Sequence, residues 1–142
     1  MVEDIEFLNA IYENAKMGIV GIDKIKNDIN GQNLLKVINE QKNDYYSICT
    51  KAMKLLSLSN AERKNVSPIA KIMTFMDARM KLIKDDSDSN IAKMMIEGNN
   101  MGIIKLNERL NNYKGDNKKI INLAKELIEI EQRNLTNLKK FL

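Results

Sequence analysis

The sequence predicts an all-α protein: a four-helix bundle in which a long helical crossover joins two hairpins. Apolar residues recur at three- and four-residue steps almost throughout, and no segment of useful length alternates with period two. Leu, Ile, Lys and Glu dominate, while the chain has one Pro and no Trp, which favours helix. At 142 residues, the whole chain (1–142) fits one domain with one core.

The first hairpin is expected over residues 3–56. Its first helix runs from about Glu3 to Asp28 and ends at Asn30-Gly31, where Gly is suited to a left-handed cap. Its second helix runs from about Gln32 to Leu56, and the short joint makes the two antiparallel. The predicted core stripes are Ile5, Leu8, Ile11, Ala15, Ile19, Ile22 and Ile29, then Leu34, Val37, Gln41, Tyr45, Ile48, Ala52 and Leu55.

The crossover helix is expected over residues 68–84. The preceding stretch, 57–66, is polar, and Ser67-Pro68 combines a side-chain cap with a proline at the first helical position. A helix of roughly 17 residues spans about 25 Å at 1.5 Å per residue. That is nearly the length of the expected bundle.

The second hairpin is expected over residues 90–141. The cluster at 85–89 is rich in Asp and Ser and suits a turn and cap before a helix from about Asn90 to Asn112. The segment 114–116 then leads to a last helix from about Asn117 to Phe141. The stripes are Ala92, Ile96, Asn99, Ile103, Leu106, Leu110 and Tyr113, then Ile120, Ala124, Leu127, Glu131, Asn134, Leu138 and Phe141.

These stripes contain four polar residues, Gln41, Asn99, Glu131 and Asn134, at positions that should face the core. A buried carboxylate costs several kcal/mol unless it is partnered. We therefore expect these groups to hydrogen-bond one another or Arg79 of the crossover helix, or else to hold water. Such a buried polar network would fix the register of otherwise interchangeable Leu and Ile seams.

Two motifs occur twice in the same order, which indicates an internal duplication. Residues 13–19 nearly repeat at 97–103, and the tetrapeptide at 40–43 nearly repeats at 131–134. Gly18 and Gly102 occupy matching places in the first motif. Because glycine inside a helix costs about 0.5–1 kcal/mol relative to alanine, we expect a close helix contact there, between the first helices of the two hairpins.

The duplicated motifs and the hairpin–crossover–hairpin order resemble the ferritin-like superfamily, most closely its small rubrerythrin-type bacterial members. In that family, the first and third bundle helices each provide a Glu, and the second and fourth each provide Glu-x-x-His. The resemblance implies Glu13, Glu40 with Asn43, Glu97, and Glu131 with Asn134 as the corresponding positions. Both histidine places hold asparagine, and the chain has no histidine.

Two interpretations arise from this resemblance. At 100° per residue, Glu13 and Glu97 lie about 200° from neighbouring core positions, and only Glu131 and Asn134 clearly face inward. Because imidazoles normally complete a di-iron site, we favour a non-catalytic bundle without a cofactor or metal. The alternative is a histidine-free carboxylate site for iron or manganese at Glu13, Glu40, Glu97 and Glu131.

The composition indicates which classes of partner this chain is expected to bind. The 23 basic and 19 acidic residues alternate along the chain, which does not favour nucleic-acid binding, and no long apolar run could span a membrane. The single cysteine and the lack of a secretory signal indicate a cytoplasmic protein. We expect a structural or interaction module, not an enzyme, that binds another helical protein or forms a homo-oligomer through leftover apolar surface such as Phe7, Met17 and Val20.

Overall fold

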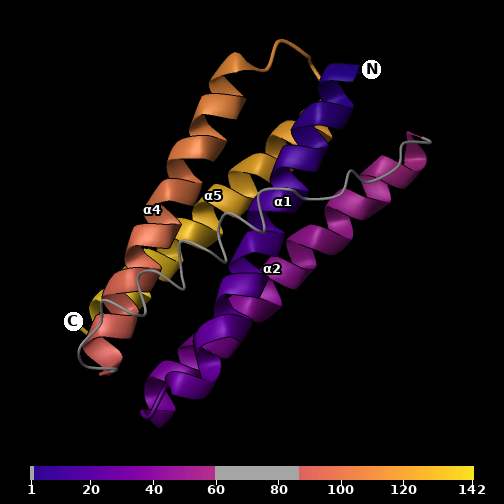
Figure 1. Cartoon of the computed structure of the whole chain (residues 1–142). Helices are drawn as coiled ribbons and strands as arrows, with labels where there is room; N and C mark the ends of the chain where they lie inside the picture. Colours follow the sequence, from indigo (N-terminus) through magenta and orange to yellow (C-terminus); the bar gives the residue numbers. More distant parts are fainter. Residues whose placement is uncertain (1, 60–86) are drawn as a thin grey trace.

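The structure is a computed structural model that describes residues 2–59 and 87–142, and its regular structure in these ranges is entirely helical. Four long helices pack together (Figure 1). They are α1 (Val2–Ile25), α2 (Gln32–Leu58), α4 (Asp88–Asn112) and α5 (Lys118–Lys139), with a short 3-10 helix, η1 (Lys26–Asp28), after α1. The all-α prediction is confirmed for these residues, whereas the predicted crossover helix at 68–84 lies outside them.

Side-chain caps begin the helices of the second hairpin. The Ser87 hydroxyl accepts a hydrogen bond from the Asn90 backbone N–H (3.3 Å), and Asn117 Oδ1 accepts one from the Lys119 N–H (3.1 Å). Each bond satisfies one of the donors that the first turn of a helix leaves unpaired. The Asp- and Ser-rich cluster before α4 therefore does contain the cap that its composition predicts.

Gly31 does not form the predicted left-handed cap. Its backbone is extended (φ −82°, ψ 130°), and it is the N-cap of α2, while α1 ends through η1. Glycine is needed here for space, because a Cβ atom would collide with Asp88 Oδ2. The Gly31 N–H also donates to Asp88 Oδ1 at 3.4 Å, so the turn of the first hairpin contacts the first residue of α4.

The contacts between helix ends establish the direction of each helix. The Gly31–Asp88 bond places the beginning of α2 beside the beginning of α4, so these two helices run the same way. The Lys114 N–H donates to Glu3 Oε1 (2.5 Å), which places the end of α4 beside the beginning of α1. Consequently α2 ends and α4 begins at opposite ends of the bundle (Figure 1).

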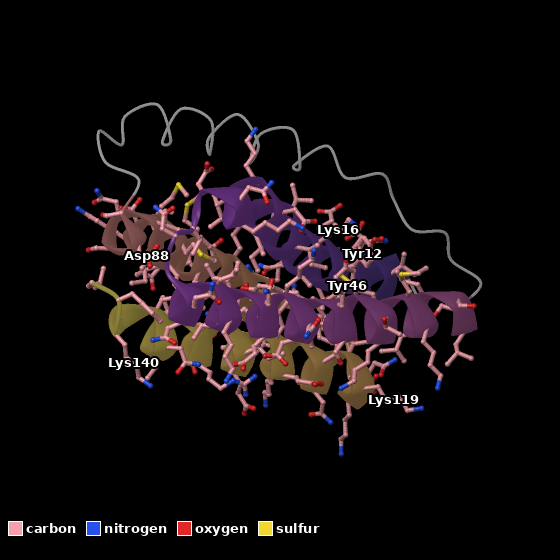
Figure 2. The ribbon with its side chains drawn as sticks, turned by 90° about the horizontal axis from the view of Figure 1, so that it is seen from below. Tyr12, Lys16, Tyr46, Asp88, Lys119 and Lys140 are labelled. Atoms are coloured by element: carbon pink, nitrogen blue, oxygen red, sulfur yellow. The ribbon has the colours of Figure 1, made fainter. Side chains whose placement is uncertain are left out.

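The two hairpins pack side by side. α1 lies against α4, α2 lies against α5, and α1 also contacts α5. Ion pairs from Lys51 to Glu126 (2.7 Å) and from Arg133 to Asp44 (3.0 Å) follow the antiparallel course of α2 and α5. Figure 2 shows α5 alongside α2, with Lys119 and Lys140 near its two ends.

Core side chains come from all four helices, as the apolar spacing predicts. The largest fully buried ones are Leu8, Ile11, Ile19, Ile22, Ile25, Leu34, Ile38, Ile48, Leu106, Ile120, Leu127 and Leu138. Phe7 also belongs to this core: it is 3% exposed and its ring packs on Tyr113, with centroids 4.9 Å apart. The prediction that Phe7 offers leftover surface is therefore wrong, and Met17 and Val20 are partly buried.

Candidate functional site

The hydroxyl of Tyr45 joins three helices inside the bundle. It donates to Asn99 Oδ1 on α4 at 2.8 Å and accepts a hydrogen bond from Asn134 Nδ2 on α5 at 3.2 Å. Asn99 Nδ2 donates in turn to the Met95 carbonyl one turn earlier (3.1 Å). Tyr45, Asn99 and Asn134 are all buried, so these bonds form in a medium of low polarity, where an unmade bond is costly.

The spacing of apolar residues explains why these side chains face inward. Asn134 and Glu131 take two successive places in the stripe of α5, between Leu127 and Leu138, and both are at most 3% exposed. On α2, Gln41 lies one turn before Tyr45 on the same buried face. The four polar residues that the stripes place inside the bundle are all buried in the structure, with exposed fractions of 6% or less.

The two matched glycines make room for this cluster. A Cβ atom at Gly18 would lie 2.6 Å from Tyr45 Cε2, and one at Gly102 would lie 2.7 Å from Glu131 Oε1. These distances are too short for a real Cβ contact, so glycine lets the ring and the carboxyl group pack against a helix backbone. Each glycine therefore faces the other helix of its own hairpin, and the Gly102 backbone also contacts α1 through Asn14.

Asn14 connects α1 to the same region, although its place in the sequence did not single it out. Its Nδ2 donates to the Gly102 carbonyl at 3.1 Å, and the residue is 6% exposed. A polar residue between Ile11 and Ala15 was the available signal, but it falls beside the apolar stripe. We call Asn14, Gln41, Tyr45, Asn99, Glu131 and Asn134 the polar cluster; it receives side chains from all four helices.

Glu131 is the ionisable carboxyl group of the polar cluster. Burial raises its pKa well above 4.5, because leaving water disfavours the charged form. Burial also raises the pKa of Tyr45, and the negative charge of an ionised Glu131 raises it further. The neutral forms of both groups are therefore favoured, which suits hydrogen bonding and packing more than acid–base exchange with solvent.

Gln41 and Glu131 are not satisfied by the described residues. In the ranges 2–59 and 87–142, Gln41 Oε1, Gln41 Nε2 and Glu131 Oε2 are buried without a hydrogen-bond partner. The described residues do not show the expected direct bonding among the four predicted residues. The Tyr45 hydroxyl joins Asn99 to Asn134, and Gln41 and Glu131 stay outside this chain of bonds. Arg79, the other expected partner, lies outside the described residues.

The carboxylates implied by the family resemblance have different environments. Glu131 is buried, Glu13 and Glu97 are partly buried, and Glu40 is exposed together with Asn43. Among the described residues, no three or more Asp, Glu or Cys side chains form a group suited to a metal ion. The repeated tetrapeptides are therefore not equivalent in space, because Gln41, and not Glu40, occupies the buried stripe of α2.

No protein-family model, curated protein or solved structure matches this chain. Within residues 2–59 and 87–142, none of the helices has both the length and the apolar character needed to cross a membrane.

Proposed function

We propose that this chain is a non-catalytic helical-bundle module that acts through contact with other protein surfaces and associates with itself. The observation that carries the proposal is the closure of the polar cluster, whose side chains are at most 6% exposed. A catalytic group must reach its substrate, and these groups contact other helices of the bundle. Their neutral forms are also favoured by burial.

In this proposal, the polar cluster specifies how the helices pair. Leu and Ile seams pack in several registers with similar energy, whereas a buried hydrogen bond is satisfied in only one of them. The bonds from Tyr45 to Asn99 and Asn134 would be lost if α4 or α5 slid by one turn. Stability would then fall, since each buried polar group left without a partner costs about 1–3 kcal/mol.

The proposed contact surfaces are the outer faces of the helices. Tyr46 and Met53 on α2 and Met101 and Ile104 on α4 are large hydrophobic side chains with 44% to 57% of their area exposed. Size-exclusion chromatography with light scattering, over a hundredfold range of concentration, tests self-association. A dimer or larger species that dissociates on dilution supports the proposal, and a strict monomer contradicts it.

The ferritin-like arrangement belongs to this proposal too. It is supported by the common direction of α2 and α4, together with the antiparallel packing of α1 on α4 and of α2 on α5. A crossover along the bundle is what such directions require. The cytoplasmic setting rests on the single, buried cysteine, Cys49.

A histidine-free site for iron or manganese remains the alternative. Glu131 supports it to the extent that a buried carboxylate without a partner on Oε2 is a suitable ligand for a hard cation. Elemental analysis of protein purified without chelator, followed by titration with Fe²⁺ or Mn²⁺, separates the two. Stoichiometric metal that is lost in Glu131→Ala favours the alternative, and protein that binds no metal favours the non-catalytic module.

A further inference from the structure

The outer face of α2 carries an uncharged seam. Its residues follow one another at steps of four, three, four, three and four, which keeps them on one side of the helix. All six are exposed, and none is charged, although charged residues make up 30% of the chain. The outer seam consists of Asn39, Asn43, Tyr46, Thr50, Met53 and Ser57.

The spacing of the outer seam is that of a helix-pairing face. Alternating steps of three and four are the a and d positions of a heptad, along which two helices pack. The series of steps between seam residues also reads the same in both directions along α2. If a second α2 runs antiparallel, Tyr46 meets Thr50, Asn43 meets Met53 and Asn39 meets Ser57, so both copies use the same surface, as an isologous dimer requires.

The charges beside the outer seam fit the same pairing. Glu40 and Lys54 each follow a seam residue directly, on the same edge of α2, and both are exposed. Neither forms an ion pair with another residue in the ranges 2–59 and 87–142, whereas Asp44 and Lys51 are paired with α5. In the antiparallel arrangement, Glu40 of one copy comes within reach of Lys54 of the other copy, and symmetry makes this pair twice.

We propose that two copies of this chain dimerise by antiparallel pairing of α2 through the outer seam, with two Glu40–Lys54 ion pairs between the copies. This inference rests on the self-association in the proposed function and gives it a surface and a geometry. Tyr46, labelled in Figure 2, is 47% exposed and lies near the centre of the outer seam, and Met53, 44% exposed, is the other large hydrophobic side chain of the seam.

Charge exchange across the dimer tests this geometry. Glu40→Lys and Lys54→Glu each replace two attractive pairs by two repulsive ones, and the double variant restores the attraction with the partners reversed. Exposed pairs of this kind are individually weak, so two of them predict roughly tenfold weaker dimerisation for each single variant. The double variant should return to within about threefold of the unmodified protein.

Matched controls remove the effect of net charge. Glu129→Lys and Lys125→Glu make the same changes at exposed positions of α5 and should leave the dimer constant nearly unchanged. Sedimentation velocity over a range of concentrations gives the constants, and circular dichroism verifies that every variant is folded. Because all four positions are exposed, the fold should tolerate each change.

The outcomes separate this inference from the broader proposal. Weaker dimerisation in both single variants, with recovery in the double variant, supports antiparallel pairing of α2. A dimer that responds to Glu40→Lys no more than to Glu129→Lys, or that does not recover in the double variant, overturns the pairing but leaves self-association in place. A protein that is monomeric at every concentration overturns both.

Discussion

Replacing Tyr45 by phenylalanine removes one oxygen atom and thereby tests the polar cluster. The ring stays, so its packing on Gly18 is kept. The bonds to Asn99 Oδ1 (2.8 Å) and from Asn134 Nδ2 (3.2 Å) are both lost. Since Asn99 Oδ1 and Asn134 Nδ2 then each lose this partner, at about 1–3 kcal/mol apiece, Tyr45→Phe should lower the free energy of unfolding by about 2–6 kcal/mol.

The neighbouring tyrosine provides a matched control. Tyr46 is 47% exposed, and Tyr46→Phe removes the same atom without leaving a buried group unpaired. Its effect should be within about 0.5 kcal/mol. Urea unfolding followed by circular dichroism measures both variants, and an unchanged dependence on urea concentration would show that the unfolded state is not altered.

A Tyr45→Phe variant that loses no more stability than Tyr46→Phe would refute the role given to the buried hydroxyl. A second comparison is needed because a water molecule that replaces the lost hydroxyl group would reduce the loss of stability. Adding Asn134→Leu to Tyr45→Phe removes a donor that has already lost its acceptor, so the double variant should lose clearly less than the two single losses added together. Strict additivity would mean that Tyr45 and Asn134 are not coupled in the folded protein.

Two further predictions concern the surroundings of Tyr45. Because burial raises the pKa of Glu131 above 4.5, the folded state holds this proton more tightly than the unfolded state does, and stability is lost as pH rises from 4.5 through the folded pKa. The difference in unfolding free energy between the unmodified protein and Glu131→Gln should thus fall by up to about 1.4 kcal/mol per pH unit in this window, and a difference independent of pH would contradict the burial. Gly18→Ala should destabilise the protein by about 1–3 kcal/mol through collision with the Tyr45 ring. At Gly98, no atom beyond its chain neighbours and the backbone of its own helix lies within 4 Å of the new Cβ, so Gly98→Ala should be neutral or stabilising by up to about 1 kcal/mol. Equal thermal shifts for the two alanine variants would count against the close contact at Gly18.

The helices and the inward-facing polar residues could be predicted because both depend on spacing along one helix. The alternation of three- and four-residue steps fixes which face of α5 is buried, and Glu131 and Asn134 fall on that face. The similarity of the two tetrapeptide sequences does not predict burial, for the same reason. Glu40 and Glu131 begin similar tetrapeptides, but Glu40 is one residue away from the buried stripe at Gln41. Whether a residue is buried depends on its angular position around the helix relative to the core, and not on the similarity of its neighbouring sequence to another segment.

Contacts between distant helices could not be predicted in this way. The partner of Asn14 is the carbonyl of Gly102, a backbone atom whose position depends on how α1 and α4 pack. The role of Tyr45 as a bridge likewise depends on the directions of three helices. The left-handed backbone predicted for Gly31 is wrong for the same reason. The need for glycine comes from Asp88, and no feature of the first hairpin indicates that Asp88 would occupy the space of a side chain there.

The ionisation of Glu131 gives the most direct test of whether the polar cluster is closed. In protein labelled with ¹³C, the chemical shift of the Glu131 carboxyl carbon can be followed as a function of pH. We expect Glu131 to remain protonated well above pH 4.5, because burial raises its pKa. If Glu131 ionises near pH 4.5, water reaches its carboxyl group, and the buried position of the polar cluster is contradicted.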